Sequence, residues 1–308
     1  MVKEFPTLQG VMGAEYARRD GEPAEVVQAL REQYAPRTAQ DPIPASETGT
    51  WLSLLDRADT LTGFFGIGLS PTSSEDPYGL RRQALGLVRI LIEKPLALSL
   101  DRLLHTALQS WGSRLTVPEV ACLAQLQTFL LDRFRWWACE VWGAPREVVD
   151  AVLAAPADDL ANAAQRVRAL YVLWQDPQQR EAVLFTAGKV QERTGRIVQS
   201  VKEADAIATT VDPAKFTALA ERELWKAWTA VKATTDGLIQ QGAYAQSAAE
   251  YGKLYPQLNQ FFEKVFVMDK DPMVRANRLA LMKDIYFLYA NSVGDLSKLP
   301  LPTEVATR

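Results

Sequence analysis

Helical periodicity, interrupted by proline and glycine, is the feature that most constrains the fold of this 308-residue chain. Apolar residues recur every three or four positions in nearly every segment, and no segment alternates apolar and polar residues over the length of a convincing strand. Residues 51–65 are typical, with a predicted inner face of Leu54, Leu55, Ala58, Leu61 and Phe65. The sequence therefore predicts an all-α fold.

Several helix starts can be located from residues that cap helices. Ser99 precedes an apolar helical pattern, and Asp271 is followed by Pro272, a pair that suits the cap and the first helical position. Asp76 and Pro77 form the same pair, and Pro23 fits the first position of an earlier helix. We expect helices to begin at these points.

The length of the chain favours two domains. The stretch "SRLTVP" at residues 113–118 is the best candidate boundary, because long helical patterns with short joints follow it. We therefore predict one helical domain over residues 1–115 and a second over residues 116–308.

Composition excludes several classes of active site. The chain has one histidine, His105, and two cysteines, Cys122 and Cys139, from which neither a zinc site nor a nucleophile–base pair can be assembled. It has no Walker A loop and no apolar run of eighteen residues that would span a membrane. We predict no catalytic residue and no metal site. The two cysteines fit a reducing cytosol.

A first cluster of arginine and aromatic residues lies in "FLLDRFRWWACEVW", residues 129–142. Arginine can bind phosphate through paired N–H groups, and aromatic faces can stack on unpaired bases. The alternative is a core helix whose aromatics pack inward while its arginines reach solvent. We predict burial for Trp137, and we keep Arg133, Arg135 and Trp136 as candidate nucleic-acid contacts.

A second cluster lies in "VRANRLALM", where Arg275 and Arg278 share a helix face with Asn277 beside them. Like charges three residues apart repel weakly, so acidic partners or a phosphate would relieve them. Arg193 and Arg196 in "ERTGRIV" repeat the spacing. A formal net charge of −3 means that any nucleic-acid site must be a local cluster on an acidic chain.

The segment "DPYGLRRQALGLVRILIEK", residues 76–94, carries three further arginines. Its predicted inner residues are Leu80, Ala84, Leu87, Val88 and Leu91. Arg89 can pair with Glu93 one turn later, whereas Arg81 and Arg82 have no such partner. We predict that Arg82 faces outward with Arg89 and that Arg81 serves the fold.

Several of these segments resemble a known family. "EFPTLQGVMGAEYARRDGEPAEVVQALREQYAPR" and "LLDRADTLTGFFGIGLSPTSSEDPYGLRRQALGLVRILIEK" are similar to the HD-like region of the bacterial glycyl-tRNA synthetase beta subunit. "FFEKVFVMDKDPMVRANRLALM" resembles the closing signature of its DALR-type anticodon-binding domain. The chain thus resembles the C-terminal part of that subunit, without its N-terminal domains.

The resemblance implies a truncated HD-like helical bundle followed by a DALR-type helical bundle. Together they would place tRNA(Gly) for glycylation by the alpha subunit, as part of an ATP-dependent glycine–tRNA ligase in the cytoplasm. The fragment itself would be non-catalytic and hold no cofactor, because ATP and magnesium belong to the alpha subunit. The partners implied are tRNA(Gly), the alpha subunit or alpha region, and the N-terminal beta-subunit domains, with no membrane.

The resemblance also assigns the candidate residues to two arms of tRNA. Arg81, Arg82 and Arg89 would contact the acceptor arm from the HD-like domain. The anticodon-domain candidates are Arg133, Arg135, Trp136, Arg193, Arg275, Asn277 and Arg278.

Two other interpretations stay open. A degenerate HD phosphohydrolase would need metal ligands, of which only Asp59 remains as a possible relic. A helical assembly module would use the same arginines in salt bridges between proteins.

The family lysine near position 75 is replaced by Glu75, which weakens phosphate binding at that loop.

Overall fold

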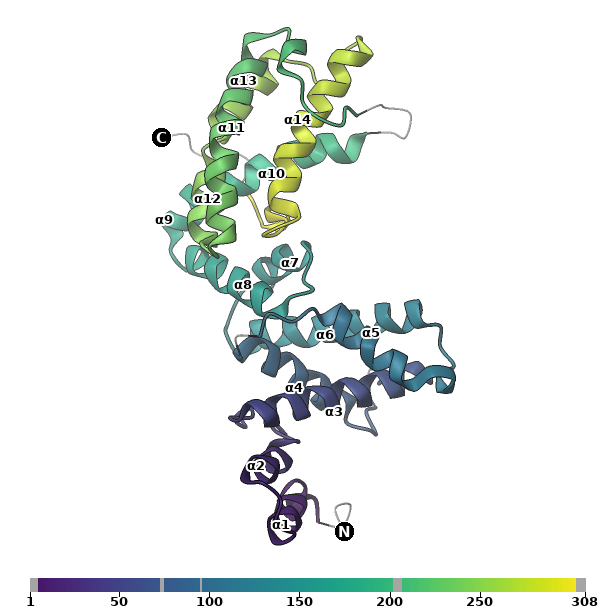
Figure 1. The fold of residues 1–308 in the computed structure, drawn as a ribbon. Helices are drawn as coiled ribbons and strands as arrows, with labels where there is room; N and C mark the ends of the chain where they lie inside the picture. The colour runs from purple at the N-terminus through teal and green to yellow at the C-terminus, as the bar shows by residue number, and fades with distance from the viewer. Residues whose placement is uncertain (1–4, 73–74, 95, 202–206, 303–308) are drawn as a thin grey trace. The chain divides into compact units, whose positions relative to one another are not determined.

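The computed structural model describes residues 5–72, 75–94, 96–201 and 207–302, and every regular element within these ranges is helical (Figure 1). The predicted all-α class is confirmed. No helix in the described ranges has the length and apolarity needed to cross a membrane. The chain divides into two compact units: unit 1 comprises residues 1–142 and 158–162, and unit 2 comprises residues 143–157 and 163–308.

Unit 1 contains η1 (Pro6–Leu8), α1 (Val11–Arg19), α2 (Ala24–Glu32), α3 (Glu47–Gly66), α4 (Leu80–Glu93), α5 (Leu100–Trp111), η2 (Gly112–Arg114) and α6 (Glu119–Glu140). Helix α8 (Leu160–Gln175) begins in unit 1 and continues in unit 2. The other elements of unit 2 are α7 (Arg146–Leu153), α9 (Pro177–Gln179), the π-helix η3 (Arg180–Phe185), α10 (Thr186–Ser200), η4 (Pro213–Lys215), α11 (Leu219–Gln240), α12 (Tyr244–Gly252), α13 (Tyr255–Lys264), α14 (Pro272–Ala290) and η5 (Leu296–Lys298).

Two predicted helix starts are confirmed. Ser99 caps α5, because its side chain accepts a hydrogen bond from the N–H of Arg102 at 3.0 Å. Asp271 caps α14 by accepting from the N–H of Met273 at 2.8 Å, and Pro272 takes the first helical position. In both cases a short polar side chain satisfies an N–H group that the helix leaves unpaired.

The other two helix starts are shifted along the chain. Pro23 is itself the residue before α2, not the first residue within it. Helix α4 begins at Leu80, three residues after Pro77. Asp76 still satisfies this helix start, because its carboxylate accepts from the N–H groups of Leu80 at 2.7 Å and Arg81 at 2.9 Å.

Helix α3 lies at the centre of unit 1, where it packs against α2, α4, α5 and α6. Its inner face includes four of the five predicted residues, namely Leu54, Ala58, Leu61 and Phe65. The prediction for Leu55 is wrong, because that side chain is 54% exposed. Successive helical residues point about 100° apart, so the neighbour of a buried Leu54 turns toward solvent.

Helix α6 belongs to unit 1, so this compact unit extends to Trp142 and does not end at residue 115. Leu126, Leu130 and Phe134 form a buried stripe on α6, and Phe129 approaches Phe65 of α3 with ring centroids 5.2 Å apart. The apolar side of α6 is thus covered by α3, α4 and α5. The sequence pattern located this helix, but it did not show which neighbours bury it.

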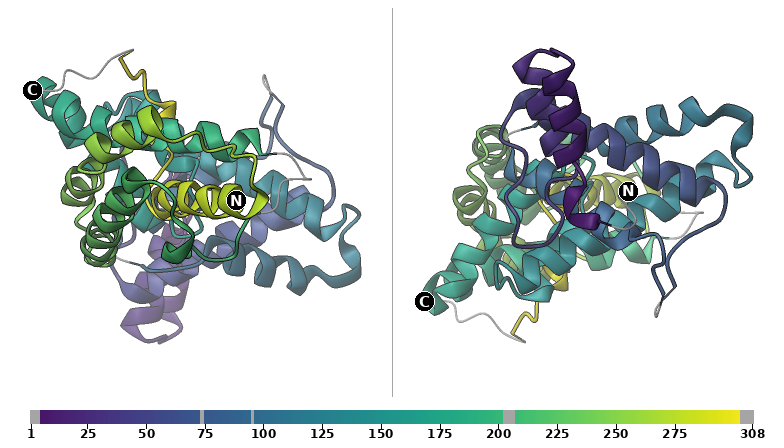
Figure 2. Two further views of the ribbon diagram at one scale, coloured as in Figure 1. Left: turned by 90° about the horizontal axis from the view of Figure 1, so that it is seen from above. Right: turned by 90° about the horizontal axis from the view of Figure 1, so that it is seen from below.

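Unit 2 is organised around α10, which packs against α12, α13 and α14, and around α11, which packs against α12 and α13 (Figures 1 and 2). Tyr251 of α12 and Tyr289 of α14 stack with centroids 4.7 Å apart. The hydroxyl of Tyr251 donates to the carbonyl of Ile285 at 2.8 Å, and burial raises the pKa of Tyr251 well above its ordinary value. This contact joins α12 to the middle of α14.

Candidate nucleic-acid interface

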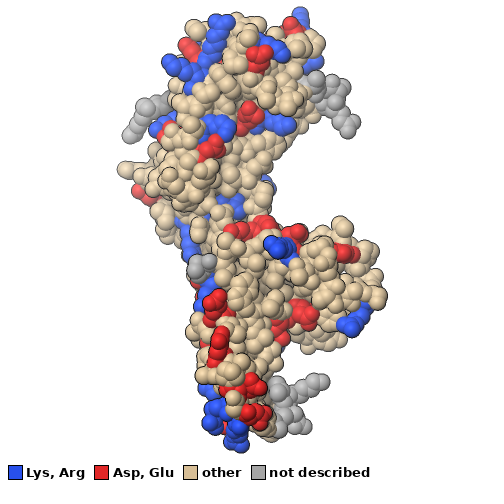
Figure 3. All heavy atoms as spheres, viewed as in Figure 1, with Lys and Arg blue, Asp and Glu red and all other residues tan. Residues whose placement is uncertain are grey.

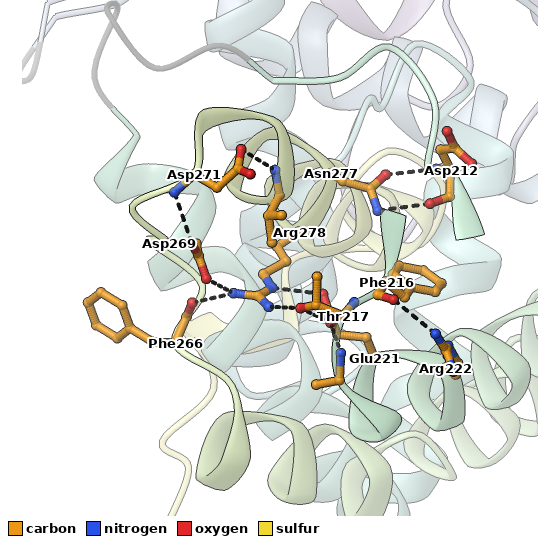
Figure 4. A network of polar contacts seen from close by, with 12 residues as sticks. Asp212, Phe216, Thr217, Glu221, Arg222, Phe266, Asp269, Asp271, Asn277 and Arg278 are labelled. Atoms are coloured by element: carbon orange, nitrogen blue, oxygen red, sulfur yellow. Dashed lines mark hydrogen bonds and ion pairs between the residues drawn. The ribbon is translucent and has the colours of Figure 1, made fainter. Parts of the chain in front are cut away.

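The start of α14 is held in unit 2 by the buried guanidinium of Arg278, which is only 5% exposed (Figure 4). Its Nε donates to Glu221 Oε1 at 2.7 Å, and its Nη1 donates to Asp269 Oδ2, also at 2.7 Å. The remaining contacts are Nη1 to the carbonyl of Phe266 at 2.9 Å and Nη2 to Thr217 Oγ1 at 3.0 Å. One side chain therefore joins α14, the start of α11 and the loop after α13.

Glu221 serves two structural purposes in this network. Its Oε2 accepts from the backbone N–H groups of Thr217 at 2.8 Å and Ala218 at 2.6 Å, which satisfies the start of α11. Burial alone would raise the pKa of Glu221, but hydrogen bonds from Arg278 and from the Ala218 N–H hold the pKa below its ordinary value. Glu221 is therefore a charged carboxylate at neutral pH.

Asn277 is also part of the fold. It is 1% exposed, its Nδ2 donates to the carbonyl of Asp212 at 3.0 Å, and its Oδ1 accepts from the Asp212 N–H at 2.7 Å. These paired bonds tie α14 to the segment that leads into α11. The predicted tRNA contacts by Asn277 and Arg278 are revised accordingly, because their polar groups are buried and bonded within unit 2.

Arg275 and Arg193 are half-buried, so part of each side chain remains accessible. The Nη1 of Arg275 donates to the carbonyl of Asp269 at 3.0 Å. Arg193 donates to Asn259 Oδ1, and its guanidinium lies 4.9 Å from the ring centroid of Phe262. Both arginines are thus oriented by contacts with α13 and the loop that follows it.

The candidates on α6 have mixed environments. Trp136 is 42% exposed, and Arg135 beside it pairs with Asp132 at 2.6 Å. Arg133 lies over the ring of Phe129, 5.5 Å from its centroid, and burial lowers the pKa of Arg133. Trp137 is buried, as predicted. The structure places this cluster in unit 1, outside the unit that carries the other anticodon-domain candidates.

The arginines of α4 separate into three roles. Arg81 donates to the carbonyl of Thr72, so it serves the preceding loop as predicted, whereas its contact with the acceptor arm stays a prediction. Arg82 is exposed, and its side chain makes no hydrogen bond or ion pair within the part of the chain that the structure describes. It remains a candidate contact.

Arg89 does not face outward, contrary to the prediction. It is buried, pairs with Glu93 at 2.7 Å and donates to the carbonyl of Asp41 at 2.8 Å. Its guanidinium also lies 4.7 Å from the ring centroid of Trp137 on α6. We therefore revise Arg89 from a tRNA contact to a residue that joins α4, α6 and the loop before α3.

Asp59 and His105, the residues considered for metal chemistry, each interact with a different acidic neighbour. Asp59 is near Asp56, and burial followed by that neighbouring charge raises the pKa of Asp59. His105 pairs with Glu119 at 2.7 Å. Within the described ranges no group of three His, Cys, Asp or Glu side chains is arranged to hold a metal ion.

Sequence reasoning missed three exposed residues next to the Arg278 network. Lys264 ends α13, Phe266 follows two residues later, and Lys270 immediately precedes the cap of α14. The alternation in "KVFVM" was a usable signal, because Val265 and Val267 are buried while the residue between them is exposed. These three residues form what we call the α13–α14 loop surface.

Charge distinguishes the two units. Acidic residues exceed basic ones in unit 1, whereas unit 2 carries a small excess of Lys and Arg. On the face drawn in Figure 3, basic side chains outnumber the acidic ones among them over the end of unit 2 that carries α13 and the start of α14. A polyanion would therefore be favoured at this end of unit 2.

Two family models match different parts of the chain. The DALR anticodon binding domain family matches residues 190–291, which include most of α10, all of α11 to α14 and the whole Arg278 network. The description of this family names an anticodon-binding domain. The glycyl-tRNA synthetase beta subunit family matches residues 1–154. The chain belongs to the glycyl-tRNA synthetase beta subunit family.

Similar proteins extend over nearly the whole chain. The glycine–tRNA ligase beta subunit of Chromohalobacter salexigens is 40% identical over 300 residues, which is 97% of this chain and 42% of that protein. The beta subunits of Desulforudis audaxviator and Trichlorobacter lovleyi are 38% and 37% identical, with the same two shares. The chain thus spans less than half the length of these relatives.

Proposed function

We propose that this chain is the tRNA-binding part of a glycyl-tRNA synthetase beta subunit and that unit 2 binds the anticodon arm of tRNA(Gly). One observation carries the proposal. The region that matches an anticodon-binding domain has a buried network at the start of α14, and beside it are exposed lysines that have no ion-pair partner among the described residues. Such an arrangement places positively charged side chains on a backbone that the buried network holds in position, and it suits contacts with phosphate groups.

Unit 1 would support the acceptor arm in this proposal. Its exposed candidate is Arg82, whose side chain has no partner among the described residues, and Arg133, Arg135 and Trp136 form a second, partly exposed group. Positioning of tRNA(Gly) would serve glycylation by the alpha subunit or alpha region in the cytoplasm, with the N-terminal beta-subunit domains as further partners. ATP and magnesium would be used in the alpha subunit, with no cofactor in this fragment.

A salt titration with a tRNA(Gly) transcript tests the proposal. Binding should weaken steeply with salt, because each phosphate contact releases a condensed counterion. Replacing both Lys264 and Lys270 with alanine should reduce the slope of log K against log salt by about 2. Lys253→Ala is the matched control, since Lys253 is an exposed lysine of unit 2 that already pairs with Glu250.

The outcomes separate the competing functions. A wild-type chain that does not bind tRNA would contradict the proposal. Salt-independent binding to the alpha subunit, without RNA binding, would favour the helical assembly module. Divalent metal retained after dialysis, together with phosphohydrolase activity, would favour the degenerate HD enzyme.

A further inference from the structure

We propose that Phe266 is a stacking platform for one unpaired RNA base. The inference rests on the proposed function of unit 2 and deepens it, because it names the residue on which a base of a single-stranded loop would lie. Phe266 stands between the end of α13 and the cap of α14, within the match to the anticodon-binding domain. Aromatic side chains bind unpaired bases through their faces, whatever the base.

The first observation is exposure. Phe266 is 76% exposed, although phenylalanine usually contributes to a core. Val265 and Val267 on either side are buried, so the backbone alternation directs the ring outward. In Figure 4 the ring of Phe266 points away from the Arg278 network, while its carbonyl points into it. The aromatic face is therefore available to a ligand.

The second observation is that the backbone beneath the ring is fixed. The carbonyl of Phe266 accepts from Arg278 Nη1 at 2.9 Å, and the same guanidinium holds Glu221 and Asp269. The N–H of Val265 donates to the carbonyl of Phe261 at 2.8 Å. A base that stacks on this ring would therefore meet a surface whose position is already set, which reduces the entropy lost on binding.

The third observation is the positive charge carried by the same loop, two residues before Phe266 and four residues after it. Lys264 and Lys270 are exposed, and within the described residues neither makes an ion pair or a side-chain hydrogen bond. Asp269 is committed to Arg278, and Asp271 to the N–H groups of α14. Glu263 is the remaining exposed carboxylate of this segment.

An exposed aromatic ring on a loop that also carries two exposed lysines is suited to a base flanked by phosphates. An apolar protein surface would match the ring but would leave the two lysines without partners. Single-stranded RNA satisfies both features, so we assign the α13–α14 loop surface to an unpaired loop of RNA.

The test measures binding of wild type and variants to a hairpin RNA that carries the anticodon loop of tRNA(Gly). Phe266→Ala should weaken binding roughly 5- to 150-fold, the range expected for one lost stacking contact. Phe266→Trp should preserve binding, and Phe266→Leu should weaken it, because leucine is apolar but has no π-face. Val172→Ala, which removes an exposed apolar side chain on α8, is the matched control.

Two further readouts distinguish stacking from other roles. The salt slope should be unchanged in Phe266→Ala, since no phosphate contact is lost. A 2-aminopurine base in the loop should be quenched by wild type and not by Phe266→Ala. The thermal unfolding temperature should be the same in all variants, because the ring of Phe266 is exposed to solvent and does not pack in the core.

The inference is overturned if wild type binds the hairpin in a salt-dependent manner and Phe266→Ala binds it equally well; the proposed function would then survive. It is also overturned if Phe266→Leu binds the hairpin as tightly as wild type does. The same holds if Phe266→Ala loses binding to the alpha subunit while it still binds RNA. If wild type binds no RNA at all, both the inference and the proposed function fail.

Discussion

Arg57 of unit 1 and Arg278 of unit 2 are both buried, but in opposite surroundings. In unit 1, Arg57 is surrounded by neutral oxygen atoms: it donates to Ser53 Oγ, Gln83 Oε1 and the carbonyls of Tyr34 and Pro36. In unit 2, the guanidinium of Arg278 meets two carboxylates. Both side chains join segments that are distant in the sequence, but only the second is neutralised by ion pairs.

The pKa values follow from this difference. Burial lowers the pKa of Arg57 to about 10, and the charge of nearby Asp56 only partly opposes that effect. Burial also acts to lower the pKa of Arg278, but Glu221 and Asp269 outweigh it and the pKa is raised. Unit 2 therefore depends on an ion-pair network that acid can break, whereas the contacts of Arg57 in unit 1 involve no carboxylate.

The largest expected effect is that of Arg278→Met. This change should destabilise unit 2 by about 3–5 kcal/mol, because Glu221 would keep its charge in a buried position without a counter-charge. Hydrogen exchange at the amides of α11 and α14 measures the loss. Replacing Glu221 with glutamine in the same chain should recover part of it, and a loss below about 1 kcal/mol would contradict the role of the network.

A smaller effect is expected for Arg57→Met, the matched change in unit 1. Destabilisation of about 1–3 kcal/mol should follow, since the change leaves oxygen acceptors unsatisfied but no buried charge. Exchange at the amides of α3 and α4 is the measurement. If Arg57→Met costs more than Arg278→Met, the distinction between a neutral cage and an ion-pair network is wrong.

The smallest effect is the dependence on pH. The pKa of Glu221 is lower in the folded state than in the unfolded state. The stabilisation that ionised Glu221 gives to the fold is therefore fully present above its unfolded-state pKa, and it is lost as the pH falls through its folded-state pKa. Urea unfolding of the chain should show stability falling below about pH 4.5, with at most about 1.4 kcal/mol per pH unit from this group. Glu221→Gln should flatten the curve, and an unchanged slope would exclude Glu221 as the titrating group.

Local signals in the sequence predicted local structure well. Ser99 and the Asp271–Pro272 pair located the starts of α5 and α14, because capping depends on residues within one turn of each other. The role of Arg81 was also predictable, since its partner Thr72 lies in the loop just before the helix. The resemblance to a known family could also be recognised locally, because it rested on contiguous sequence motifs.

The candidate site was less predictable. Spacing showed that Arg275 and Arg278 share a face of α14, but not that Glu221 and Asp269 would cover the guanidinium of Arg278. Arg89 could be paired with Glu93 by its spacing, yet its burial against Trp137 of α6 could not be foreseen. Helical spacing fixes which residues point the same way and says nothing about the element that packs on them.

The sequence by itself determined the helical class, the main caps, the set of arginines and the family. Only the tertiary structure decided which arginines are bonded within the fold, that α6 belongs to unit 1, and that Phe266 is exposed. The physical reason is range. Capping and periodicity act within a few residues, whereas desolvation and charge pairing depend on groups such as Arg278 and Glu221, which are 57 residues apart and meet only after folding.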